Sequence, residues 1–141
     1  MKDIILIATI KDWNINNFYE FKKKFEDKYN LYLITNKDDL IYQNVKDLNP
    51  KYIFFPHWSW LIPNEIYKNY ECILFHMTDL PYGRGGSPLQ NLITNKIYNT
   101  KISAIKVTKE LDEGDIYLKE NFDISKGSAR EIYENASNLI F

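Results

Sequence analysis

The sequence predicts an α/β fold: a mostly parallel sheet with helices on both faces and antiparallel strands toward the C-terminus. Short, almost entirely apolar runs alternate with segments whose apolar residues recur every three or four positions. Strands that are apolar throughout are typical of parallel sheets covered on both faces. The last two apolar runs flank a turn-like stretch, Leu111-Asp112-Glu113-Gly114, which favours antiparallel pairing of those two strands.

The first half of the chain predicts a regular alternation of strands and helices. The strands are the apolar runs at residues 4–8, 31–34, 52–55 and 72–75. The first helix is predicted over residues 17–29, because Phe18, Phe21, Phe25 and Tyr29 share one helical face. A second helix is predicted over residues 38–48, before Pro50, and a short third one over residues 64–69.

The second half predicts two more helices and two strands. Ser87-Pro88-Leu89-Gln90 combines an N-cap serine, a first-position proline and a capping-box glutamine, which indicates a helix over residues 88–95. The strands are predicted at residues 102–107 and 115–122, and a capping box at Ser128 opens a last helix. Since the chain stops inside that helix without a C-cap signal, we expect a single domain over residues 1–141 that is truncated at its C-terminus.

Composition narrows the class of protein. A chain of 141 residues fits one domain that buries roughly 68–70% of its unfolded surface. A net charge of −1 and a pI near 6.1 predict no general affinity for nucleic acid or anionic membranes. Without a signal peptide or an apolar segment of about 20 residues, we expect a cytoplasmic protein. The single Cys72 excludes an internal disulfide and a thiolate metal cluster, and no metal site is predicted.

The most informative segment begins at His76, which ends an apolar strand and precedes a glycine-rich stretch. Histidine at a strand end is suited to general acid–base chemistry, because its ordinary pKa of about 6.5 is near working pH. The glycines let the backbone approach a ligand, and Arg84 adds a charge that attracts carboxylate or phosphate. A simple flexible connection explains the glycines equally well. The predicted substrate-binding residues are Thr78, Asp79, Tyr82, Gly83, Arg84, Gly85 and Gly86.

The spacing of His76, Leu80-Pro81, Arg84-Gly85, Pro88, Thr100 and the Leu-Asp-Glu-Gly stretch resembles the N-terminal catalytic domain of the formyltransferase family. Members of that family act on methionyl-tRNA, glycinamide ribonucleotide and nucleotide-linked amino sugars. The resemblance implies a Rossmann-like fold, 10-formyltetrahydrofolate as the formyl donor, and a catalytic trio of asparagine, histidine and aspartate.

Carried over by motif, the resemblance assigns the catalytic histidine to His76 and the catalytic aspartate to Asp112, which would orient the imidazole. Leu74 stands where the family has its asparagine. Loss of one hydrogen-bond donor to the developing oxyanion typically lowers the rate ~100- to 1,000-fold. His57 also follows an apolar strand, so we expect it either to supply the missing donor or to be a turn histidine held by local hydrogen bonds.

The aromatic loop after the third predicted strand is the candidate folate site. Two tryptophans near a strand end either stack on a flat ring or simply pack in the core. The first alternative gives Trp58, Trp60, Leu61 and Ile62 as predicted cofactor-binding residues, and the family resemblance adds Leu111 and Gly114 of the Leu-Asp-Glu-Gly stretch. No G-x-G-x-x-G follows the first strand and no Walker A motif is present, so neither motif supports a dinucleotide or P-loop site.

The functional hypothesis is therefore a cytoplasmic enzyme of one-carbon metabolism. It transfers a formyl group from 10-formyltetrahydrofolate to an amine, for which family analogy suggests an amino sugar carried on a nucleotide. One alternative lets water attack instead of an amine, giving a formyltetrahydrofolate hydrolase or another deacylase. A second alternative, suggested by Leu74, is an inactive domain that binds a ligand or a partner without turnover.

Overall fold

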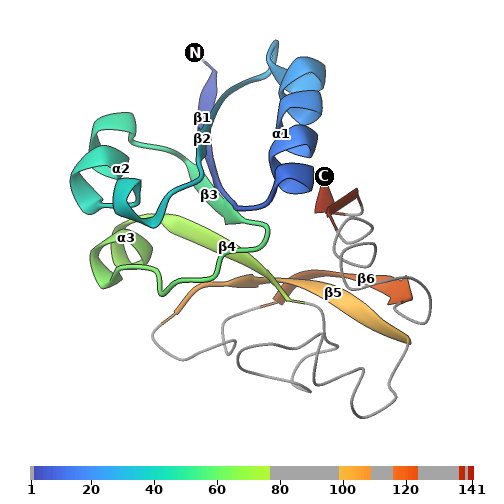
Figure 1. Cartoon of the computed structure of the whole chain (residues 1–141). Helices are drawn as coiled ribbons and strands as arrows, with labels where there is room; N and C mark the ends of the chain where they lie inside the picture. Colours follow the sequence, from blue (N-terminus) through green and yellow to red (C-terminus); the bar gives the residue numbers. More distant parts are fainter. Residues whose placement is uncertain (1, 77–98, 109–115, 124–136, 139) are drawn as a thin grey trace. The chain divides into compact units, whose positions relative to one another are not determined.

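The computed structural model describes residues 2–76, 99–108, 116–123, 137–138 and 140–141. These residues belong to two compact units, Met1–Ile73 with Phe141, and Leu74–Ile140. The helices and strands, labelled in Figure 1, are β1 (Asp3–Ala8), α1 (Asp12–Phe25), β2 (Tyr29–Ile34), the 3-10 helix η1 (Lys37–Asp39), α2 (Tyr42–Leu48), β3 (Tyr52–Phe55), α3 (Asn64–Asn69), β4 (Glu71–His76), β5 (Asn99–Lys106) and β6 (Ile116–Asp123).

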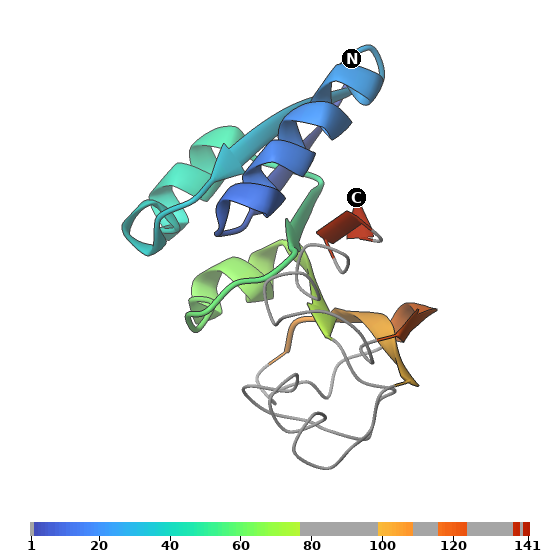
Figure 2. The same cartoon turned by 45° about the vertical axis from the view of Figure 1, so that its right-hand side comes forward.

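The first unit is built on a parallel sheet with helices on both of its faces. Its strand order is β2-β1-β3-β4, and β1 pairs in parallel with both β2 and β3. In this register Ile5 lies opposite Leu31 on one side and Tyr52 on the other. Helix α1 covers one face of these strands, and α2 and α3 lie on the other, as Figures 1 and 2 show. Helices on both faces are the expected way to bury apolar strands completely.

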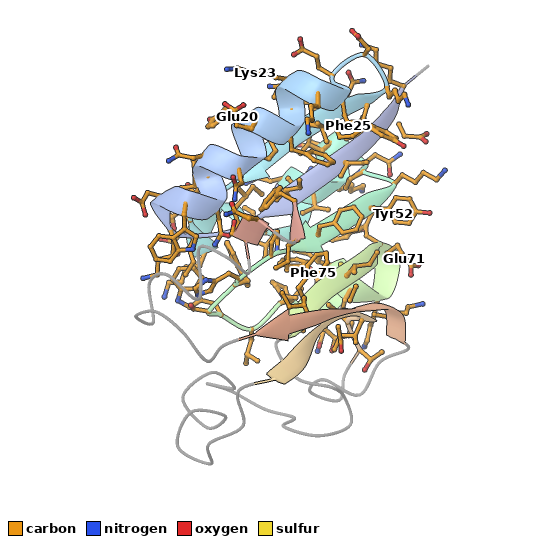
Figure 3. All side chains as sticks on the ribbon, turned by 90° about the vertical axis from the view of Figure 1, so that its right-hand side faces the viewer. Glu20, Lys23, Phe25, Tyr52, Glu71 and Phe75 are labelled. Carbon is orange, nitrogen blue, oxygen red and sulfur yellow. The ribbon has the colours of Figure 1, made fainter. Side chains whose placement is uncertain are left out.

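The core under α1 is apolar and rich in aromatic side chains. Phe18 is 1% exposed and packs with the buried Ile5, Ile7 and Leu31. Each fully buried side chain of this kind contributes about 1.5–3 kcal/mol relative to an exposed one. Half-buried residues extend the cluster: Phe21, Phe25, Tyr29, Leu33, Phe54 and Phe141. Figure 3 shows the opposite side of α1, where Glu20 and Lys23 face away from the strands.

The second unit contains the antiparallel strands. Its strand order is β4-β5-β6, and β5 pairs antiparallel with β6, with Ile102 opposite Glu120. The register shifts between Ala104 and Ile105, as at a β-bulge. Residues 102–105 of β5 are buried, including the hydroxyl-bearing Ser103.

The structure confirms the predicted fold class and corrects two elements. All the predicted strands are found, with shifts of a few residues at their ends, and the predicted antiparallel pair is β5 and β6. The first helix is Asp12–Phe25 rather than residues 17–29, and Tyr29 begins β2. The predicted helix over residues 38–48 is η1 followed by α2, because Leu40 and Ile41 leave the helical conformation. The predicted helix at residues 88–95 and the turn at Leu111–Gly114 lie outside the described residues.

Candidate functional site

The candidate site described by the structure lies at the carboxyl ends of β1 and β3. Because these strands are parallel neighbours, the loops that follow them leave the sheet at the same edge. Ligands of open α/β sheets bind at this edge. The loop after β1 spans residues 9–11, and the loop after β3 spans residues 56–63 and carries the predicted His57 and the predicted aromatic residues.

Thr9 joins the two loops. Its side chain is completely buried, and its hydroxyl donates a hydrogen bond to the carbonyl oxygen of Pro56. The same hydroxyl lies 3.4 Å from the carbonyl oxygen of His57. The Thr9 amide donates to the carbonyl oxygen of Ile34, at the end of β2, at 3.0 Å. One residue thus connects the carboxyl ends of β2, β1 and β3.

Both loops contain a backbone conformation that is uncommon for residues other than glycine. Lys11, which precedes the first residue of α1, has a φ of 75°, and His57 has a φ of 81°. The His57 amide donates to the carbonyl oxygen of Phe55 at 3.1 Å. A bond between residues two apart around a proline fits an inverse γ-turn, because proline fixes φ near the required value. The chain therefore turns sharply directly after β3 and presents His57.

The surroundings of His57 favour its neutral form. Burial lowers the pKa of the imidazole below its ordinary value of 6.5, and the positive charge of Lys11 lowers that pKa further. A neutral imidazole carries one N–H donor and one acceptor nitrogen. It can therefore donate a hydrogen bond to a ligand without carrying a charge at neutral pH.

The aromatic loop combines a half-buried residue, Trp58, with the exposed residues Trp60 and Leu61. The ring of Trp58 packs edge-to-face on Phe55, with centroids 6.1 Å apart, and on Trp60 at 5.0 Å. Trp60 is 40% exposed and Leu61 is 89% exposed, whereas Ile62 is half-buried. Within the described part of the chain, the buried indole N–H of Trp58 has no hydrogen-bond partner. The loop thus offers exposed apolar surface next to a buried polar donor.

Several residues at this edge carry only weak signals in the sequence. Thr9 and Lys11 lie directly after the first strand, where no G-x-G-x-x-G motif follows, and Asn14 is buried with its side-chain amide donating to the carbonyl oxygen of Ile10 at 2.8 Å. A threonine after an apolar strand and a buried asparagine in the first turn of a helix are common in many folds. Only the pairing of the strands brings Thr9 to the turn after β3.

The other predicted site residues belong to the second unit or lie outside the described residues. His76 ends β4 as predicted, but its side chain is not among those described, so the orientation of its imidazole by Asp112 and the replacement of the missing donor by His57 stay predictions. Leu74 is half-buried on β4. Outside the described residues lie Thr78, Asp79, Tyr82, Gly83, Arg84, Gly85, Gly86, Leu111, Asp112 and Gly114.

The described residues offer neither a metal centre nor a reactive thiol. Within them, no three histidine, cysteine or acidic side chains gather as metal ligands would. Burial raises the pKa of the Cys72 thiol to about 12, so this group is a poor nucleophile. Among the helices described, none has the length and apolar character needed to cross a membrane.

Comparison with known proteins identifies relatives in sequence. No protein-family model matches the chain. Methionyl-tRNA formyltransferase from Campylobacter jejuni is 32% identical over 103 residues, which are 73% of this chain and 34% of that protein. The same enzyme from Rickettsia rickettsii is 30% identical over 108 residues, 74% of this chain and 36% of the relative. The chain thus spans about a third of the length of the curated relatives it matches.

Solved structures share the fold over nearly the whole chain. Methionyl-tRNA formyltransferase from Clostridium thermocellum is 58% identical, with a TM-score of 0.96, over 98% of this chain and 60% of that one. HypX from Aquifex aeolicus, in complex with tetrahydrofolic acid, is similar in fold at 21% identity and a TM-score of 0.74, over 92% of this chain and 23% of HypX. The chain therefore belongs to the formyltransferase family and corresponds to the N-terminal domain of its members.

Proposed function

We propose that this chain carries the catalytic site of a formyltransferase, which moves a formyl group from 10-formyltetrahydrofolate to an amine. The observation that carries the proposal is the 58% identity to a methionyl-tRNA formyltransferase over 98% of the chain. At this level of identity, with a TM-score of 0.96, the fold is shared, and the residues at the sheet edge are the natural place for the chemistry. We also propose the cytoplasm as its location.

The loop after β3 fits the ring system of a folate. Trp60 and Leu61 expose apolar surface that a flat ring can cover, and the ring of Trp58 holds Trp60 by an edge-to-face contact. The indole N–H of Trp58, which has no hydrogen-bond partner among the described residues, is suited to a ring nitrogen or carbonyl oxygen, which would satisfy a buried donor. Of the solved structures with this fold, HypX was obtained in complex with tetrahydrofolic acid. We assign the same role to Ile62, Leu111 and Gly114.

We assign the catalytic roles from what an amine attack on a formyl carbon requires, which is a base for the amine proton and a hydrogen-bond donor for the formyl oxygen. His76 removes the proton of the attacking amine and returns it to the departing nitrogen of the folate, and the Asp112 carboxylate orients its imidazole and stabilises the protonated form. His57 donates a hydrogen bond to the formyl oxygen as negative charge develops there. The lowered pKa of His57 supports this role, because a neutral donor keeps its charge state across the working pH range.

The acceptor is proposed to be an aminoacyl-tRNA such as methionyl-tRNA. The relatives from Campylobacter jejuni, Rickettsia rickettsii and Clostridium thermocellum are all methionyl-tRNA formyltransferases, which favours this acceptor over the nucleotide-linked amino sugar that the sequence suggested. The glycine-rich segment with Arg84 is assigned to an anionic part of the substrate. A phosphate of the tRNA backbone has the required charge.

A single assay separates the candidate functions. The purified chain is mixed with 10-formyltetrahydrofolate and with methionyl-tRNA, a nucleotide-linked amino sugar, or buffer alone, and tetrahydrofolate release and formylated product are measured. Transfer to methionyl-tRNA is the expected result. Release in buffer alone would instead identify a hydrolase, and the absence of release under all conditions would contradict catalysis by this chain.

The specific observation that favours a second candidate, a ligand-binding domain without turnover, is Leu74 on β4. A leucine cannot donate the hydrogen bond that the family asparagine supplies. If His57 does not replace that donor, Leu74→Asn restores transfer that the natural chain lacks. If His57 does replace it, Leu74→Asn changes the rate little, and His57→Ala lowers it ~100-fold or more.

A further inference from the structure

The hydroxyl of Thr9 occupies a position where the rest of its strand is apolar. The residues of β1 from Ile5 to Ala8 are buried and apolar, and Thr9 follows them with no exposed surface. Valine has almost the same shape as threonine and would suit such a site, apart from the hydroxyl. A buried hydroxyl costs free energy unless it is hydrogen-bonded, so its partner indicates what it does.

That partner is the turn that presents His57. The hydroxyl has one hydrogen, which it donates to the carbonyl oxygen of Pro56, with the carbonyl oxygen of His57 as a longer second contact at 3.4 Å. The turn itself is sharp, because His57 has a φ of 81° and its amide bonds back to Phe55. A conformation of this kind costs about 1–3 kcal/mol and persists only where surrounding contacts hold it.

We propose that Thr9 is a positioning residue of this enzyme, whose hydroxyl holds the Pro56–His57 turn and thereby keeps the imidazole of His57 half-buried at the carboxyl edge of the sheet. The role of Thr9 in the reaction rests on the proposed function of His57 as a hydrogen-bond donor. Its role in holding the turn is independent of that proposal. Thr9 suits this task because its amide is bonded to Ile34 at the end of β2, so that the hydroxyl is anchored on two strands.

The first test reads the position of His57 directly, without substrate. The chain has two histidines, so the His57 ring signals are assigned by their loss in His57→Asn and followed by NMR as the pH is varied. In the natural chain, burial and Lys11 hold the pKa of His57 below its ordinary value. Thr9→Val removes the hydroxyl, which releases the turn and lets water reach the imidazole, so the His57 pKa rises toward about 6.5.

Two control variants separate the hydroxyl from general destabilisation. Thr9→Ser keeps the hydroxyl and leaves the His57 titration as in the natural chain. Ser103→Ala also removes a completely buried hydroxyl, on β5 in the second unit, and leaves the same titration unchanged. If Thr9→Val does not fold, Thr9→Ala is titrated in its place. An unchanged His57 titration in the variant that lacks the hydroxyl overturns the proposal, as does the same shift in Ser103→Ala.

The second test measures the reaction. Displacement of a catalytic group by about 1 Å costs roughly 100-fold in rate, so Thr9→Val is expected to lower kcat by about 10- to 100-fold. In a His57→Ala background the same change has no further effect, because Thr9 acts through His57. An equal loss in both backgrounds overturns the proposal. If the natural chain has no transferase activity, the proposed function fails while the titration still decides the role of Thr9 in the fold.

Discussion

At the scale of single residues, His57 links the site to the stability of the chain. Its pKa is lowered in the folded chain, so at mildly acidic pH the unfolded chain binds a proton that the folded chain does not. The free energy of unfolding contributed by His57 is therefore fully present above about pH 6.5 and is lost as the pH falls through the lowered folded-state pKa. His57→Asn removes this dependence, and asparagine tolerates the positive φ better than most residues.

The measurement is urea unfolding of the natural chain and of His57→Asn at about pH 7.5 and at about pH 5. We expect the natural chain to lose stability relative to the variant at the lower pH. Other groups titrate in both proteins and cancel in the difference. A difference between the two proteins that is the same at both pH values would contradict a lowered pKa for His57.

From the sequence, residues of the candidate site can be predicted only where polar or aromatic side chains directly follow a predicted strand. His57 and the aromatic loop could be predicted because a histidine and two tryptophans directly follow an apolar run. The contact of Thr9 with the turn at Pro56 could not be predicted, because its hydroxyl donates to a carbonyl group 47 residues away in the chain. Contacts of that kind depend on the order and register of β1 and β3, which periodicity does not contain.

At the scale of elements, the first helix was predicted with the correct buried face but with wrong bounds. The spacing of Phe18, Phe21, Phe25 and Tyr29 predicted one helix, yet Tyr29 belongs to β2. All four side chains nevertheless pack in the same core cluster. The prediction failed at the boundary because Glu26 and Asp27 give no glycine or asparagine stop signal, although the helix ends there.

The packing of α1 gives a prediction about stability. Phe18 is the buried centre of the helix face, so Phe18→Ala is expected to lower the free energy of unfolding by about 3–5 kcal/mol. Glu20→Ala is the matched control on the solvent side of the same helix, where its contact with Lys23 at 3.6 Å is exposed and contributes about 0–1 kcal/mol. Urea unfolding measures both. Equal losses would mean that α1 is not held by the Phe18 cluster.

At the scale of the whole molecule, the alternation of strands and helices is enough to predict a mostly parallel sheet with an antiparallel end. Parallel pairing of β1 with β2 and β3, and antiparallel pairing of β5 with β6, agree with that expectation. The proposed catalytic residues His76 and Asp112 were predicted from motif spacing and not from packing. Their geometry stays a prediction, because it depends on side chains outside the described set.

A ligand that binds only the folded chain stabilises the whole molecule, whichever residues catalyse. With tetrahydrofolate at about 100 times its Kd, the free energy of unfolding is expected to rise by about 2.7 kcal/mol, measured by urea or thermal unfolding.

Trp60→Ala and Leu61→Ala should reduce this increase, because both side chains expose the surface assigned to the folate ring. Tyr19→Ala is the matched control, since Tyr19 is also an exposed aromatic residue but lies on α1. Stabilisation without formyl transfer would favour the ligand-binding domain, whereas no stabilisation of the natural chain would remove the folate site from the loop after β3.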